Sequence, residues 1–274
     1  MAIKLKKLNK LLIERKLVDT IEEANELIGA GLVILNGFTA QNIKTQCPFD
    51  SSIKVNKTDK KWVSRGAHKL LQGINKFGIN PDDKTCIDIG ASTGGFTDVL
   101  LAHNARRVYA VDVGYGQLAW KLRNSEKVIV MERTNARFLT NDMFEEGKVD
   151  LIVSDASFIS MKLILPVLEQ LLKTDGSIVV LIKPQFEISK EIIDNGVVRN
   201  PQDHVDVLSD MYSFIMNETK LKLVNSTYSP IKGPEGNIEF LFQCKLKENN
   251  NTEYVPDFEA LVSEAHNNVC AHIH

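Results

Sequence analysis

The sequence lacks long hydrophobic runs, and its few cysteines are scattered. No apolar stretch approaches the ~18 residues that a membrane-spanning helix needs, and the amino-terminal MAIKLKKLNK has no apolar core of the kind found in signal peptides. Cys47, Cys86, Cys244 and Cys270 have neither metal-ligand nor redox spacing, and the histidines form no cluster before the last three residues. We therefore expect a cytoplasmic protein with reduced thiols, no membrane partner and no bound metal.

Charge is unevenly distributed along the chain. Residues 1–62 hold 11 Lys and Arg against 7 Asp and Glu, a net charge of +4, whereas the remainder holds 22 against 28, a net charge of −6. A basic first segment on an acidic body favours a polyanionic partner. Charge of this kind is also typical of an ordinary solvated surface.

The first segment predicts two helices followed by a hairpin. Leucines within residues 8–12 are spaced for one helix face, and Thr20 with Glu23 forms a capping-box pattern that opens a second helix. Gly31 stands where that helix should end. The stretch LVILNGFTAQ then predicts two strands around a tight Asn-Gly turn.

Beyond Ser64, strands alternate with helices, which predicts an α/β fold with a mainly parallel sheet. The last two strands lie close together in the sequence and should form an antiparallel pair at the sheet edge. We expect a small α+β domain at 1–58, a linker at 59–63, the large domain at 64–248, and a tail at 249–274 that ends in a helix. The expected strands are TCIDIG, RVYAVDV, VIVMER, DLIVSD, SIVVLIK, KLVNSTYS and IEFLFQCKL.

A glycine-rich turn follows the first strand of the large domain, in CIDIGASTGGFTDVLL. The apolar strand ends at Asp88 and a helix should begin near Phe96, the context in which backbone N–H groups approach a nucleotide-like ligand. Ser92 stands where a pyrophosphate fingerprint needs glycine. The pattern D-x-G-x-S-x-G-G-F instead resembles motif I of methyltransferases that use S-adenosylmethionine. A site for NAD or another nucleotide is the alternative.

Two residues further along fit the same cofactor. Asp112, at the end of the next strand, is placed to accept hydrogen bonds from ribose hydroxyls. Asn135 would flank the adenine, although an Asn after a strand is also common in turns. The expected cofactor-binding residues are Asp88, Gly90, Ser92, Thr93, Gly94, Gly95, Phe96, Asp112, Val113, Asn135 and Asp155.

The ends of the fourth and fifth strands indicate which atom is methylated. The fourth ends in VSDASF, without the proline pair typical of base amino-group methylation, and neither strand end carries the cysteine that carbon methylation needs. The residues found there are Asp155 and Lys183, the latter directly after an apolar run and before Pro184. In a doubly wound sheet both should face the cofactor crevice.

Two further charged residues complete a known set. Taken singly, Lys69 is typical of a solvated helix surface and Glu239 of an edge strand. Together with Asp155 and Lys183 they stand where ribose 2′-O-methyltransferases of the FtsJ-like class have a Lys-Asp-Lys-Glu tetrad. The chain resembles the TlyA (haemolysin A-type) ribosomal RNA methyltransferases in the words WVSRGAHKL, GASTGGFT, DVGYGQLAWKLR, ERTNAR, SDASFIS, IKPQFE, GVVRN and GPEGNIEF.

This resemblance implies a Rossmann-like methyltransferase domain behind an S4-like RNA-binding module. It also implies S-adenosylmethionine-dependent methylation of cytidine 2′-hydroxyls in ribosomal RNA of the small or large subunit, with no obligatory protein partner. A desolvated lysine near another cation can become a base. Lys183 would thus act as a base or as a clamp, Asp155 would orient it, and Lys69 and Glu239 would fix the ribose and its phosphate. The expected RNA contacts are Lys6, Lys7, Lys10, Arg15, Lys16 and Arg65.

Two other functions remain open at this point. A non-catalytic RNA-binding or ribosome-assembly factor could keep the fold without the activity, although the tetrad and the glycine-rich turn are both intact. A pore-forming haemolysin, suggested by the family's label, finds no support in any spanning segment or long amphipathic basic helix.

Overall fold

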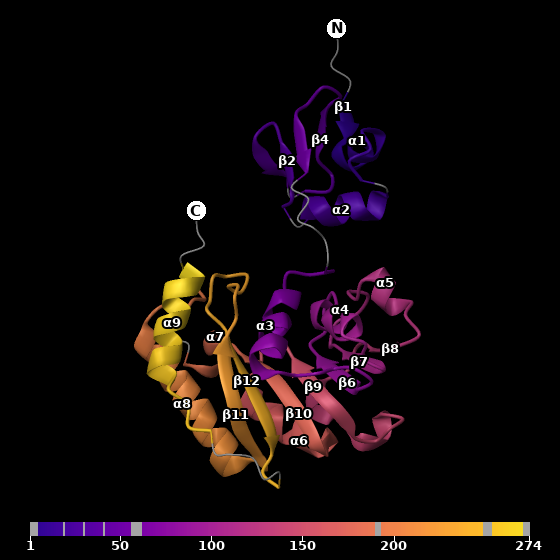
Figure 1. Ribbon diagram of the computed structural model, residues 1–274. Helices are drawn as coiled ribbons and strands as arrows, with labels where there is room; N and C mark the ends of the chain where they lie inside the picture. Colours follow the sequence, from indigo (N-terminus) through magenta and orange to yellow (C-terminus); the bar gives the residue numbers. More distant parts are fainter. Residues whose placement is uncertain are drawn as a thin grey trace. The chain divides into compact units, whose positions relative to one another are not determined.

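The computed structural model describes residues 5–18, 20–29, 31–40, 42–55, 62–189, 193–248 and 254–270. The chain divides into two compact units, Met1–Lys61 and Trp62–His274 (Figure 1). Most of the predicted linker at 59–63 lies outside the described residues.

The described residues of the first unit form two helices and five short strands. β1 pairs with β4, and β2 lies between β3 and β5 in a three-stranded antiparallel sheet. Its elements are β1 (Leu5–Lys7), α1 (Leu8–Glu14), α2 (Ile21–Gly29), β2 (Val33–Leu35), β3 (Phe38–Ala40), β4 (Gln46–Pro48) and β5 (Ile53–Val55).

The local sequence signals explain these elements. The predicted leucines of α1 are fully buried, and the N–H of Glu23 donates to Thr20 Oγ1 at 3.1 Å, half of the capping box. Asn36 and Gly37 both have positive φ, 49° and 85°, as a tight hairpin turn between β2 and β3 requires. The predicted helices and hairpin are therefore confirmed.

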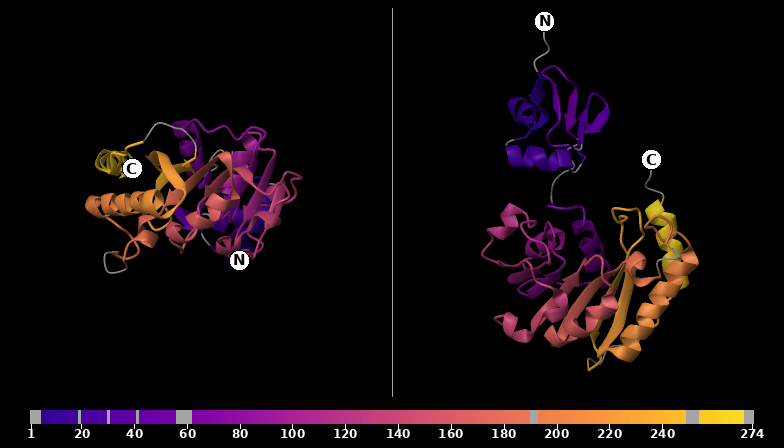
Figure 2. Two further views of the ribbon diagram at one scale, coloured as in Figure 1. Left: turned by 90° about the horizontal axis from the view of Figure 1, so that it is seen from below. Right: turned by 180° about the vertical axis from the view of Figure 1, so that it is seen from behind.

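The second unit is built on a seven-stranded sheet in the order β11-β12-β10-β9-β6-β7-β8. The five strands from β10 to β8 run parallel, and β12 is antiparallel to both β10 and β11 (Figure 2). The predicted parallel sheet with an antiparallel edge is confirmed. The strands are β6 (Thr85–Ile89), β7 (Arg107–Val111), β8 (Val128–Met131), β9 (Val149–Ser154), β10 (Leu172–Ile182), β11 (Leu221–Tyr228) and β12 (Phe240–Leu246).

Helices cover both faces of this sheet. α3 and α4 share an apolar cluster with one face of β9, β10 and β12, whereas α6, α8 and α9 pack in the cluster on the other face. Burial on both faces explains the continuous apolar runs of the central strands. The helices are α3 (Ala67–Phe77), α4 (Gly95–Ala102), α5 (Trp120–Arg123), α6 (Leu165–Leu171), α7 (Pro184–Glu187), α8 (Pro201–Glu218) and α9 (Phe258–Cys270), with 3₁₀ turns η1 (Ala136–Phe138), η2 (Asn141–Met143) and η3 (Met161–Leu163).

Four details differ from the sequence prediction. β10 begins at Leu172, before the predicted Ser177, because its pairing with β9 continues across an irregularity in register. Glu239 precedes β12 and does not lie within it. The stretch WVSRGAHKLLQGINKF predicts Arg65 and Lys69 one turn apart on a helix, but Arg65 lies in the turn before α3. Lys69 is buried because α3 packs it toward the sheet.

No helix in the described parts of the chain is long and apolar enough to cross a membrane. Within the same residues, no three His, Cys, Asp or Glu side chains gather in a way that could hold a metal ion.

A buried histidine joins α8 to α9. His204 Nδ1 lies 3.0 Å from His266 Nε2, and the His204 ring packs at 5.6 Å from the ring of Phe240. Burial, followed by the neighbouring His266, lowers the pKa of His204 to about 4. His204 is therefore neutral in the folded protein near pH 7.

This histidine predicts acid sensitivity. Between pH 6.5 and pH 4 the unfolded chain binds a proton at His204 that the folded protein excludes, so the free energy of unfolding falls as the pH falls. Relative to His204→Leu, the wild type should lose about 3 kcal/mol over this range. Urea unfolding of both proteins at pH 7.0, 5.5 and 4.5 measures the difference. If the free energy of unfolding changes with pH by the same amount in both proteins, the prediction is wrong.

Candidate active site

The candidate site lies at the carboxyl edge of the parallel strands. β10, β9, β6 and β7 are neighbours in the sheet, and they end immediately before Lys183, Asp155, Gly90 and Asp112. Neighbouring parallel strands end at one edge, where ligands bind in folds of this class. The topology thus brings the predicted tetrad and the glycine-rich turn to the same place.

The four predicted catalytic residues form one chain of alternating charge. Lys183 Nζ lies 2.7 Å from Asp155 Oδ1 and donates to the Asp155 carbonyl at 3.1 Å and to Ser157 Oγ at 2.6 Å. Lys69 Nζ lies 3.3 Å from Asp155 Oδ2 and 2.7 Å from Glu239 Oε2. Both oxygens of Asp155 therefore face an ammonium group, and Glu239 closes the far end.

Three of these charges are almost completely buried. Lys69 and Lys183 are each 6% exposed, and Glu239 is 1% exposed. Burial by itself would lower the pKa of Lys69, but the carboxylates of Asp155 and Glu239 outweigh it and raise that pKa above its ordinary value. Burial raises the pKa of Glu239, although Lys69 and Lys183 oppose the change. These charges are stable only as a set, because an unpaired buried ion is very costly.

Close backbone packing surrounds Glu239 and the start of the helix that carries Lys69. A Cβ atom at Gly233 would lie 2.6 Å from Glu239 Oε1, so only glycine leaves room for the carboxylate. A Cβ atom at Gly66, the residue before α3, would lie 3.6 Å from Asp155 Oδ2, which shows how closely the start of this helix approaches the tetrad. Lys69 enters the site from the first turn of α3.

Lys183 is positioned by the end of its own strand. It has an extended backbone and caps α7, whose first residue is Pro184. A proline fits the first helical position because its missing N–H would be unpaired there, and it restricts the preceding residue to an extended conformation. The strand therefore ends with the lysine at the sheet edge, as the sequence predicted.

The glycine-rich turn packs directly against the end of β9, where Asp155 follows. Gly90 has φ +76°, and a Cβ atom there would lie 2.9 Å from the Cα of Ala156, next to Asp155. Gly94 has φ +95°, and a side chain there would collide with Leu122. Gly94, Gly95 and Phe96 are buried at the start of α4, whereas Ser92 and Thr93 are exposed at the tip of the turn.

Asp88 carries a buried carboxyl group beneath this turn. Its Oδ2 accepts hydrogen bonds from Thr97 N at 2.9 Å and Thr97 Oγ1 at 2.6 Å. Its Oδ1 is buried and has no hydrogen-bond partner among the described residues. Burial raises the pKa of Asp88 to about 7, although the bonds from Thr97 oppose it. A cationic donor at Oδ1 would satisfy the free oxygen and stabilise the charged form.

The two distal cofactor candidates lie after β7 and β8. Asp112 accepts from Ser92 N at 2.7 Å and from Gly114 N at 2.6 Å, so its carboxylate joins two loops. The following Val113 is exposed. Asn135 accepts from Arg137 N at 3.0 Å and caps the short helix η1. This contact gives Asn135 a structural role in its own turn. The predicted contact with adenine stays a prediction.

Two residues that the sequence analysis did not single out belong to the same edge. Ser157 contacts Lys183, and Phe158 follows it with its side chain 90% exposed and a positive φ of 64°. The Phe158 ring lies 5.2 Å from that of Phe186. An exposed phenylalanine in a strained conformation beside buried charges indicates a contact surface. The only sequence signal was the SDASF stretch itself.

The predicted RNA contacts divide into three groups. Lys6, Lys7 and Lys10 line an open hollow of about 640 Å³ in the first unit, where Lys6 pairs with Glu14 at 2.7 Å. Arg15 donates to the carbonyls of two residues in the 49–51 turn, which is a structural role. The remaining two residues are exposed: Lys16, at the end of α1, and Arg65, in the second unit.

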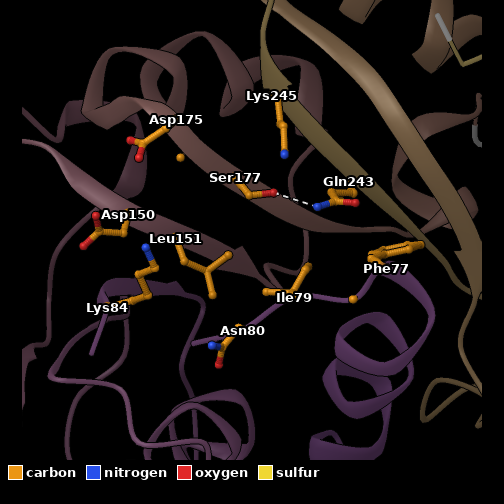
Figure 3. Close-up of a pocket in the computed structure, with 12 residues that line it drawn as sticks. Phe77, Ile79, Asn80, Lys84, Asp150, Leu151, Asp175, Ser177, Gln243 and Lys245 are labelled. Carbon is orange, nitrogen blue, oxygen red and sulfur yellow. Dashed lines mark hydrogen bonds between the residues drawn. The ribbon is translucent and has the colours of Figure 1, made fainter. Parts of the chain in front are cut away.

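A second hollow, of about 210 Å³, lies at the opposite end of the strands (Figure 3). Lys84, Lys245 and Asp150 line it together with Ser177 and Gln243, which are joined by a hydrogen bond of 3.0 Å. Asp150 stands near the start of β9, whereas the tetrad begins where this strand ends, about 17 Å away at the usual rise per residue. This hollow is therefore separate from the candidate site.

The buried ion pairs predict asymmetric mutational effects. Lys69→Met should destabilise the protein by about 3–5 kcal/mol because it leaves Glu239 buried without its nearest cation. The double variant Lys69→Met/Glu239→Leu should recover most of that loss. Denaturant unfolding at pH 7 measures both variants. Equal stability of the single and double variants would contradict the coupling.

Comparison with known proteins agrees with this geometry. A family model for FtsJ-like methyltransferases matches residues 62–246. The chain is 44% identical over 239 residues to the 16S/23S rRNA (cytidine-2′-O)-methyltransferase TlyA of Mycobacterium tuberculosis, covering 86% of this chain and 88% of the relative. It is 43% identical over 270 residues to YqxC of Bacillus subtilis, covering 97% and 96%.

A solved structure is also similar over nearly the whole chain. The protein, a hemolysin by name from Streptococcus thermophilus, has a TM-score of 0.76 and 37% identity, and the match covers 97% of this chain and 98% of that one. The family resemblance predicted from the sequence motifs is confirmed by these matches. The chain belongs to the FtsJ-like methyltransferase family.

Proposed function

We propose that this protein transfers a methyl group from S-adenosylmethionine to the 2′-hydroxyl of cytidine in ribosomal RNA. The observation that carries the proposal is the alternating chain Lys183, Asp155, Lys69 and Glu239 beside the glycine-rich turn. The substrate comes from the relatives, since the TlyA protein of M. tuberculosis is named for cytidine 2′-O-methylation of 16S and 23S rRNA. Ribosomal RNA as the substrate would place the activity in the cytoplasm.

The residues at the sheet edge fit S-adenosylmethionine. The free buried oxygen of Asp88 suits the α-ammonium group of the cofactor, and Asp112 is placed to accept from ribose hydroxyls. The absence of a side chain at Gly90 lets this turn lie against Ala156, beside Asp155. When bound, the cofactor supplies a methyl group activated by an adjacent sulfonium.

Asp155 and Lys183 are the groups that would meet the substrate. A ribose hydroxyl is a poor nucleophile near neutral pH, so the site must hold it in line and take or share its proton. Lys183 would contact this hydroxyl, either as a base or as a hydrogen-bonding clamp. Asp155 fixes the position of the lysine Nζ through its carboxylate and its carbonyl.

Lys69 and Glu239 would act through Asp155. Both are nearly inaccessible, and Lys69 pairs with both carboxylates. We infer that they are positioning residues, a more indirect role than the predicted contact with the ribose and its phosphate. Their charges hold the second oxygen of Asp155 while the first holds Lys183.

Phe158 offers a surface for the target nucleotide. Enzymes that modify a nucleotide within a helix turn it out of its stack, and aromatic rings then replace the lost stacking. Phe158 is exposed, follows the Asp155 strand end, and is supported by Phe186. The first unit would bind RNA as an S4-like module, with Lys7 and Lys10 near phosphates and affinity that falls as salt rises.

Methyl transfer to separated ribosomal subunits and to their free RNA tests the proposed function. With labelled S-adenosylmethionine, the wild type should place the label on a cytidine 2′-oxygen. Lys183→Ala should lower kcat by about 10²–10⁴-fold because it removes the proposed proton acceptor or clamp. Lys173→Ala breaks an ion pair with Asp150 at the far edge and serves as the matched control, with kcat within twofold of the wild type.

The outcomes of this assay separate the candidate functions. Label on a base would mean another methylation chemistry, and no label with intact RNA binding would mean a non-catalytic RNA-binding factor. Near-normal transfer by a folded, cofactor-bound Lys183→Ala protein would overturn the role of this lysine.

Phe158 predicts a test of base stacking. Phe158→Ala should weaken methyl transfer about 10- to 100-fold, since stacking on an aromatic side chain contributes about 1–3 kcal/mol per base. Phe158→Trp should keep most of the activity because it keeps an aromatic ring, and Phe158→Leu should lose it. All three substitutions keep the same backbone strain, so the difference between the Trp and Leu variants reports stacking alone. Steady-state kinetics, with the ribosomal subunit that accepts the methyl group as substrate, measures kcat/KM. Equal kinetics for the Trp and Leu variants would exclude stacking.

A further inference from the structure

We propose that Glu187 is a positioning residue that fastens α7, and with it Lys183, to the segment that carries Asp155. The inference rests on the proposed function, because it assigns a new role within the same site. Glu187 is the last residue of the four-residue helix α7, and Lys183 caps the beginning of that helix.

The Glu187 carboxylate uses both of its oxygens. Oε2 accepts from Ser160 Oγ at 2.5 Å, and Oε1 accepts from Met161 N at 2.8 Å. Ser160 Oγ in turn accepts from Lys162 N at 3.2 Å, at the start of η3. A single side chain thus fixes the far end of the segment that begins at Asp155.

Three contacts therefore join α7 to residues 155–161. Lys183 binds Asp155 and Ser157 at one end of α7. The Phe186 ring contacts that of Phe158 in the middle. Glu187 forms the third contact at the other end. Because each end of α7 is attached to the same segment, its position relative to Asp155 depends on both attachments.

A four-residue helix cannot keep this position by itself. One turn of helix is unstable without tertiary contacts. Hydrogen bonds to an ionised carboxylate are stronger than neutral ones. We infer that the contact at Glu187 limits how far α7 can tilt and thereby keeps Lys183 Nζ against Asp155.

The surroundings of Glu187 agree with such a role. Burial raises the pKa of Glu187, whereas the bonds from Ser160 and Met161 oppose the change; Lys162 also lowers this pKa, and Asp210 raises it. Lys162 itself pairs with Asp210 at 2.6 Å. The charged form of the Glu187 carboxylate therefore depends on its two hydrogen-bond donors. If their loss lets Lys183 move, the rate should fall, because a displacement of 1 Å at a reacting centre costs about 10²-fold.

The test compares Glu187→Ala, Ser160→Ala and the double variant with the wild type. Glu187→Ala should lower kcat 10- to 100-fold, with the KM for RNA and the Kd for S-adenosylmethionine within twofold. The double variant should have nearly the kcat of Glu187→Ala, because the hydrogen bond between Ser160 and Glu187 is already lost in Glu187→Ala. Glu169→Ala is the matched control, since Glu169 also accepts from a backbone N–H, that of Lys220 at 2.7 Å, away from the tetrad.

Hydrogen–deuterium exchange provides a readout that does not depend on activity. Glu187→Ala should speed exchange of amides in 155–163 and 183–189, and leave those of β6 and β7 unchanged. An inactive wild type would refute the proposed function, and exchange would then still decide whether Glu187 holds the segment. An active wild type with a Glu187→Ala kcat above half of normal, or with unchanged exchange, would refute this inference.

Discussion

The Asp155 carboxylate, with an ammonium group on each of its oxygens, is the interaction on which the rest of the site depends. Lys183 approaches it from the end of β10 and Lys69 from α3, and Glu239, just before β12, balances Lys69. Buried ions are tolerated only when their partners are held in place. The sheet order, which puts β9 beside β10 and β10 beside β12, provides that arrangement.

The end of β9 also brings Asp155 next to the glycine-rich turn. Gly90 lies so close to Ala156 that no side chain fits between them, which places the backbone of the turn against the residue after Asp155. α3 contributes from the other side through Gly66 and Lys69. Under the proposed function, the residues that bind the cofactor and those that position the substrate would therefore be in direct backbone contact.

Much of the fold could be predicted from the sequence, because apolar runs and turn residues are local signals. The strands of the large unit, the Asn36-Gly37 turn and the final helix are all present in the structure. Lys183 was conspicuous as a charge at the end of a buried strand. Lys69 and Glu239 were not, since each looks like a surface residue until the fold buries it, and only the family resemblance selected them.

Other contacts could not be predicted, because they depend on loop conformation. Ser157 and Glu187 meet their partners across segments whose path no periodicity describes. Arg15 looked like a phosphate ligand, yet the structure shows it bound to backbone carbonyls of its own unit.

Among the described residues, the apolar cluster of the first unit contains only residues of that unit, and the clusters of the second contain only its own. Each unit thus has a hydrophobic core of its own. Under the proposed function, the module expected to meet RNA and the residues expected to carry out methyl transfer are therefore built on separate cores.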